Sequence, residues 1–162
     1  MNAGRAGLRR RATLAWLGAA GVAWVVAGCT TPRMAPLNLA EPGWRLRESE
    51  AVWRPAQDAP ELMGELLVAH HHDGRRWIQF SKQGLPWITA RQGGGAWQIE
   101  SPLRRRGAGG RGRPPGRVPW FLLDDLPPSD PPGHSPWRLQ RWASGWKLSN
   151  EATGEVIEGS NP

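Results

Sequence analysis

Residues 62–80 read LMGELLVAHHHDGRRWIQF and carry the clearest strand–turn–strand pattern in the chain. As a β-strand, this stretch places Gly64, Leu66 and Val68 on one face and Glu65, Leu67 and Ala69 on the other. Asp73-Gly74 is a typical two-residue hairpin turn, and residues 75–80 provide the returning strand. The segment therefore predicts an antiparallel β-hairpin.

The same alternation recurs on both sides of this hairpin. Gly-rich turns at 93–95 and 153–154 separate several of the alternating segments, and a Pro-bounded loop covers 55–60. We therefore expect a mainly β (α+β) domain, a single antiparallel sheet built mostly of consecutive hairpins. The further strands are predicted at 44–53, 87–90, 96–100, 137–141, 146–151 and 155–159.

Two segments interrupt the strand pattern. Residues 102–119 are rich in Arg, Gly and Pro and are predicted to form a loop without a core element. Residues 120–126, WFLLDDL, are predicted to form one short helix. One short helix cannot cover the apolar face of such a sheet, so we expect the sheet to curl into a half-barrel or small open barrel.

Tryptophan dominates the predicted apolar face. The chain has 11 Trp, 2 Phe and no Tyr. One interpretation is a pocket for an acyl chain or another lipophilic group, because barrel mouths commonly hold such ligands. The other is an ordinary filled core. The residues in question are Leu66, Val68, Trp77, Trp97, Ile99, Trp137, Leu139, Trp146 and Leu148.

The N-terminus has the pattern of an export signal. Arginines at positions 5 and 9–11 precede an apolar run over 14–27, about 14 residues and short of the ~20 that a spanning helix needs. Val26-Ala27-Gly28-Cys29 resembles the lipobox of bacterial lipoproteins. The resemblance implies a signal peptide over 1–28, cleavage between Gly28 and Cys29, and a lipid on Cys29.

A lipid on Cys29 implies that the mature chain is attached to a membrane. Residues 29–43 contain three prolines and are predicted to be a flexible tether, with the β domain over 44–162. Thr30 and Thr31 come directly after the cysteine, where an inner-membrane retention signal would have Asp. We therefore expect the protein to be anchored at the periplasmic face of the outer membrane.

Charge argues against a nucleic-acid partner. The formal charge is +7, but four of the 21 basic residues and none of the 14 acidic residues precede residue 29. The remaining 17 basic and 14 acidic residues give a net charge of only +3, which does not indicate a surface that binds nucleic acid.

The arginine-rich loop is the one local concentration of charge. Arg104, Arg105 and Arg106 are candidates for binding anionic lipid head groups, since guanidinium groups make bidentate contacts with phosphate. The alternative is a solvated loop. A broader role as a polyanion binder is the weakest of the functional interpretations.

The residues give no positive evidence for an enzyme, a metal or a cofactor. His70-His71-His72 invites a metal interpretation, but consecutive strand residues point to alternating faces and no usable acid completes a site. Asp124 and Asp125 are adjacent in the sequence, and this spacing does not position them as a general acid and a general base. The single cysteine is assigned to lipidation, which leaves no thiol nucleophile.

The leader, tether and hairpins together resemble a known family. Residues 64–68, 77–80 and 97–99 are closest in character to the periplasmic carrier and outer-membrane receptor of the lipoprotein-localisation pathway. The resemblance spans about 62–126 and implies a half-barrel that binds acyl groups.

We therefore expect a non-catalytic envelope lipoprotein that binds a lipid, an acyl chain or a lipidated partner. The alternative is a structural or assembly lipoprotein with a filled β core that acts through protein–protein contacts.

Overall fold

The structure is a computed structural model, and it describes residues 34–102, 106–123, 128–131, 133 and 135–161. The chain divides into two units, and every described residue belongs to the second, Thr31–Pro162. The signal peptide, Gly28, Cys29 and the first part of the tether therefore lie outside the described residues.

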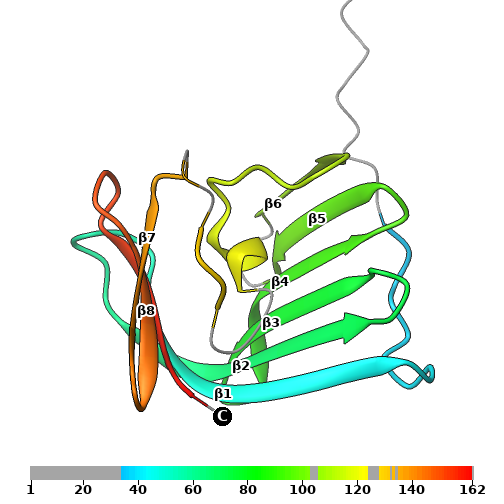
Figure 1. Cartoon of the computed structure of the whole chain (residues 1–162), viewed down its shortest axis with the longest axis horizontal. Helices are drawn as coiled ribbons and strands as arrows, with labels where there is room; N and C mark the ends of the chain where they lie inside the picture. The colour runs from blue at the N-terminus through cyan, green and yellow to red at the C-terminus, as the bar shows by residue number, and fades with distance from the viewer. Residues whose placement is uncertain (1–33, 103–105, 124–127, 132, 134, 162) are drawn as a thin grey trace, which may run out of the picture. The chain divides into compact units, whose positions relative to one another are not determined.

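The second unit is built on one nine-stranded antiparallel sheet (Figure 1). The strand order is β6-β5-β4-β3-β2-β1-β9-β8-β7. This confirms the prediction of a mainly β domain with a single antiparallel sheet made largely of consecutive hairpins. The strands are β1 Trp44–Arg54, β2 Leu62–His71, β3 Arg76–Lys82, β4 Leu85–Gly93, β5 Ala96–Ser101, β6 Arg106–Arg111, β7 Trp137–Trp142, β8 Gly145–Asn150 and β9 Glu155–Ser160.

The sheet is open, with β6 and β7 as its two edges, and it is neither closed nor strongly curled into the expected half-barrel or small open barrel. β1 joins the two halves, since β2 pairs with ten of its residues, Trp44 to Trp53, whereas β9 pairs with only Ala51 to Arg54. A turn at Asp73-Gly74 joins β2 and β3 as predicted, and Gly74 takes the positive φ of 90° that favours glycine there. It is longer than the expected two-residue turn, because residues 72–75 separate the two strands.

β6 corrects the prediction that 102–119 holds no regular element. Its six residues, RGAGGR, pair with β5 from Ala96↔Arg111 to Ser101↔Arg106. An edge strand needs backbone partners on one side only, so poor side-chain propensity does not prevent it. Gly110 also lets Trp97 lie close, because a Cβ there would sit 3.0 Å from the indole Nε1.

The expected helix over 120–126 is also corrected. A 3-10 turn, Pro119–Leu122, is present there instead, and 124–127 lie outside the described residues. The turn ends at Leu123, whose φ of −87° and ψ of 42° are outside the helical region.

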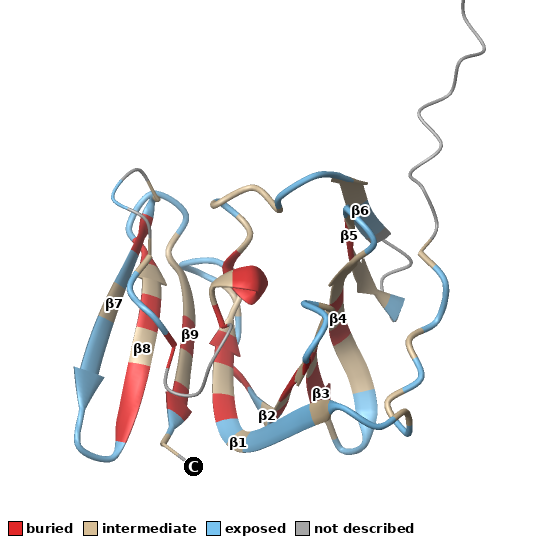
Figure 2. Cartoon of the chain, turned by 45° about the vertical axis from the view of Figure 1, so that its right-hand side comes forward, coloured by how far each residue is buried: buried red, intermediate tan, exposed pale blue. Residues whose placement is uncertain are grey.

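One face of the sheet, which we call the core face, packs against this turn, as Figure 2 shows by burial. The other face is called the outer face. The core spans both halves of the sheet and includes Trp53, Leu66, Val68, Ile78, Phe80, Trp97, Trp120, Phe121, Leu123, Trp137, Trp146, Leu148 and Ile157.

Candidate functional site

Most of the residues predicted to line a lipid pocket lie in this core. The exposed fraction is at most 1% for Leu66, Val68, Trp146 and Leu148. It is 9% for Trp97 and 4% for Trp137. Ile99 and Leu139 are half-buried and pack against the same cluster. The structure thus brings eight of these nine side chains to one face, and they fill it.

Trp77 is the exception, and its predicted place on this face is wrong. Its register partners are Ala69 on β2 and Arg91 on β4, whereas Ile78 pairs with Val68 and Ala90. Adjacent strand residues point to opposite faces, so the core position belongs to Ile78 and Trp77 lies half-buried on the outer face.

The 3-10 turn fills the centre of the core face. The Trp120 ring packs against Trp53 at 5.2 Å and Phe80 at 6.0 Å between centroids. Phe121 meets Trp97 edge-on at 5.9 Å. These contacts tie the turn to β1, β3 and β5 through aromatic pairs of favourable geometry. The sequence predicted a short helix here but did not show that its aromatic side chains pack into the core of the sheet.

A polar region lies at one end of the core face. Register aligns Arg45, His70, Arg76 and Gln92 across β1 to β4. A cavity of about 430 Å³ lies beside this row. Its lining residues are Arg76, Gln92, Arg113, Pro114, Pro115, Gly116, Phe121, Leu122, Ser129 and Asp130.

Two buried polar atoms belong to this row. His70 Nε2 and Gln92 Oε1 have no hydrogen-bond partner within the described part of the chain. Of the three arginines predicted to bind head groups, Arg104 and Arg105 lie outside that part, and Arg106 is the first residue of β6. Arg113 is the loop arginine that lines the cavity.

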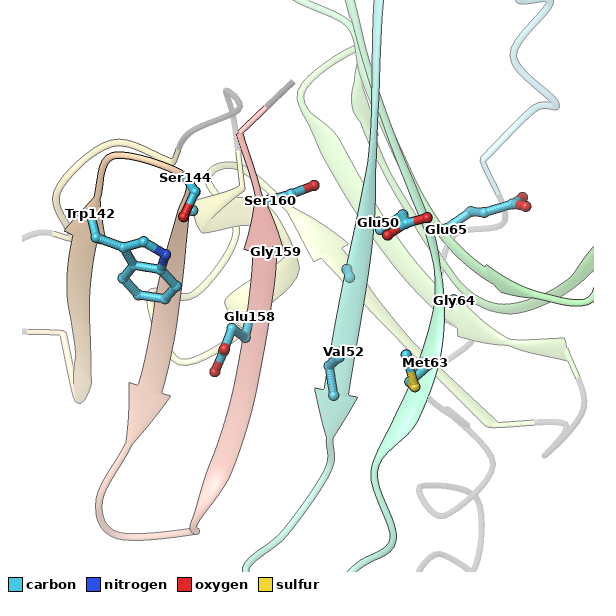
Figure 3. Close-up of a pocket in the computed structure, with 12 residues that line it drawn as sticks. Glu50, Val52, Met63, Gly64, Glu65, Trp142, Ser144, Glu158, Gly159 and Ser160 are labelled. Carbon is cyan, nitrogen blue, oxygen red and sulfur yellow. The ribbon is translucent and has the colours of Figure 1, made fainter.

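The outer face carries a groove of about 520 Å³ (Figure 3). It lies where β9 ends beside β1, and Figure 3 shows Glu50, Glu65 and Glu158 around it. Its apolar contributors include two unusually exposed side chains, Met63 at 72% and Trp142 at 43%. The groove thus combines an acidic rim with two exposed apolar side chains.

The segment before β1 contacts the sheet. Glu41 forms a bidentate pair with Arg75, at 2.9 and 3.0 Å, and the Arg75 guanidinium lies 5.5 Å from the Trp44 ring centroid. Met34 N–H donates to Gln98 Oε1 at 3.1 Å. The described part of the expected tether, 34–43, is therefore attached to the sheet and does not stand away from it.

Buried His71 belongs to the same network. Its Nδ1 lies 2.8 Å from Asp73 Oδ1, and its Nε2 lies 3.0 Å from the Pro42 carbonyl oxygen. The Arg75 backbone N–H donates to Asp73 and is the main cause that lowers the pKa of Asp73 to about 2; the His71 and Arg75 side chains lower it further. Hydrogen bonds from Arg75 also lower the pKa of Glu41.

The lowered pKa of Asp73 predicts an acid-sensitive contact at the β2–β3 turn. A carboxyl pKa depressed from 3.8 to about 2 stabilises the folded state above pH 3.8, and this contribution is lost as the pH falls toward 2. We expect carbon-13 NMR of the Asp73 carboxyl to titrate near 2. In Arg75→Ala the midpoint should rise toward 3.8, because the side-chain contact is lost while the backbone N–H remains. A wild-type midpoint near 3.8 would contradict the network.

In the described residues no group of His, Cys, Asp or Glu is placed to hold a metal ion. A helix long and apolar enough to cross a membrane is likewise absent from that part of the chain. No family model, curated protein or solved structure matches the chain.

Proposed function

We propose that this protein is a membrane-anchored envelope lipoprotein, held by a lipid on Cys29 at the periplasmic face of the outer membrane. It acts without catalysis, through contacts between its sheet and a protein partner. Of the two functions expected from the sequence, this is the structural or assembly role.

The observation that carries the proposal is the filled core face. Trp120 and Phe121 occupy the space in front of β1, β3 and β5, and eight of the nine predicted pocket side chains pack around them. An acyl chain needs an apolar cavity, and the groove beside β9 and the cavity beside Arg76 instead have charged side chains in their walls. Contacts between the protein surface and a partner therefore fit this filled core better than binding of an acyl chain inside it.

Lipid binding is the second candidate, and one observation favours it. The cover is a single four-residue 3-10 turn without a side-chain cap. Outward movement of this turn would expose the apolar core face to an acyl chain, the mode of binding implied by the resemblance to the lipoprotein-localisation proteins. Arg76 and Arg113, which line the cavity at the polar end of the core face, would then suit an anionic head group.

Native mass spectrometry of the protein purified from membranes separates the two functions. We expect the mass of the lipidated chain alone, because a filled core retains no free lipid. A second, non-covalent lipid that copurifies in fixed proportion would overturn the proposal and favour lipid binding.

A further inference from the structure

We propose that the β1 edge over residues 45–50 binds an extended segment of a partner protein as an added β-strand. The inference rests on the proposed function, because it names the surface through which the protein contact is made. It also specifies which side-chain charges the partner segment carries.

The edge arises because β1 is longer than its second neighbour. β2 pairs with β1 from Trp44 to Trp53, but β9 pairs only from Ala51 to Arg54. On the β9 side, no strand among the described residues pairs with 45–50. A strand directs backbone N–H and C=O groups alternately to each side, so this stretch offers a row of them to another chain.

Several side chains along this edge are exposed. Arg45, Leu46, Glu48 and Glu50 are exposed, and Leu46 retains 48% of its accessible surface. The groove of Figure 3 begins at Glu50, where β9 ends with Ser160. A strand added to β1 would therefore continue the line of β9 and cover apolar surface at the groove.

Side-chain charge differs between the two faces of this edge. Arg45 and Arg47 lie on the core face, because they pair with His70 and Val68 of β2. Glu48 and Glu50 lie on the outer face with Leu46. Opposite charges directly across a strand pair stabilise it, so the partner strand presents acidic residues to the core face and basic or apolar residues to the outer face.

The same charges disfavour a second copy of this chain. Antiparallel self-pairing puts residues of the same face opposite each other, and the three central registers pair Arg47 with Arg47, Glu48 with Glu48, or Arg45 with Arg47. Like charges directly opposite destabilise a strand pair. Alternating Arg and Glu thus protects the edge from self-association and selects a complementary partner.

A tethered probe tests the edge. The full-length protein would carry, after residue 162, a short Gly/Ser linker and the sequence KTKEVE, which places Lys opposite Glu50 and Glu48 and Glu opposite Arg47 and Arg45 in antiparallel register. Tethering supplies a millimolar effective concentration. We expect slower amide hydrogen exchange over 45–50, with an apparent affinity about tenfold above that of ETEKVK, which has the same composition.

Charge reversal on the protein provides the matched control. Glu48→Lys with Glu50→Lys should abolish the preference for KTKEVE, whereas Glu61→Lys with Glu151→Lys, at exposed positions away from the edge, should retain it. Unchanged exchange over 45–50 with KTKEVE, or equal slowing by both peptides, would overturn the inference.

A third result identifies a different occupant. Slowing over 45–50 that rises with the concentration of the protein without a peptide would mean that a second copy covers the edge, and this also overturns the inference. None of these results bears on whether a lipid copurifies. Failure of the edge and failure of the proposed function are therefore distinguishable.

Discussion

Cys29→Ser is expected to release the protein from the membrane fraction into the soluble periplasm. Lipid anchoring gains about 0.8 kcal/mol for each buried CH₂ group, so loss of the acyl chains removes essentially all of the attachment. Cell fractionation measures the redistribution, and the intact mass of the wild-type protein measures the modification itself. The expected wild-type mass is that of a chain beginning at Cys29 and carrying acyl groups.

Thr30→Ser is the matched control, because it alters the neighbouring residue but retains the cysteine. It should stay with the membrane fraction. An unmodified Cys29 thiol in the wild-type protein, or membrane retention of Cys29→Ser, would contradict the anchor. Recovery of the wild type mainly with inner membrane would contradict only the assignment to the outer membrane.

Trp120→Ala is expected to destabilise the domain by about 3–5 kcal/mol, the cost of removing a large aromatic side chain from a packed core. Trp120 is 2% exposed and contacts both Trp53 and Phe80. Urea unfolding followed by far-ultraviolet circular dichroism measures the change without relying on tryptophan emission.

Trp142→Ala removes the same side chain from a position that is 43% exposed. We expect a much smaller change there, about 0.5 kcal/mol. Equal effects of the two substitutions, or a Trp120→Ala variant as stable as the wild type, would mean that the 3-10 turn is no part of the core.

Hairpins were predictable because local chemistry specifies them. Asp73-Gly74 sets the β2–β3 turn, and Leu66 and Val68 show the core face by period two. The alternation alone does not show whether Trp77 or Ile78 lies on the core face, because both side chains are apolar. Ile78 lies there because it pairs with Val68 and Ala90, and this register depends on pairing between strands.

Other features depend on contacts distant in sequence. β6 forms from a segment without strand propensity, because β5 offers a backbone partner and Gly110 admits Trp97. The groove and the free β1 edge exist because β9, which comes much later in the chain, stops at Ser160 while β1 continues. No local signal in β1 marks that difference.

We propose that side chains permanently fill the core face, so that function lies on the outer surface and edges. Hydrogen exchange of the lipidated protein in nanodiscs, with and without an added palmitoylated lipopeptide, tests this at residues 121–123. We expect protected amides whose exchange the lipopeptide leaves unchanged. A saturable change in their exchange would show that a lipid displaces the 3-10 turn, and would contradict a permanently filled core.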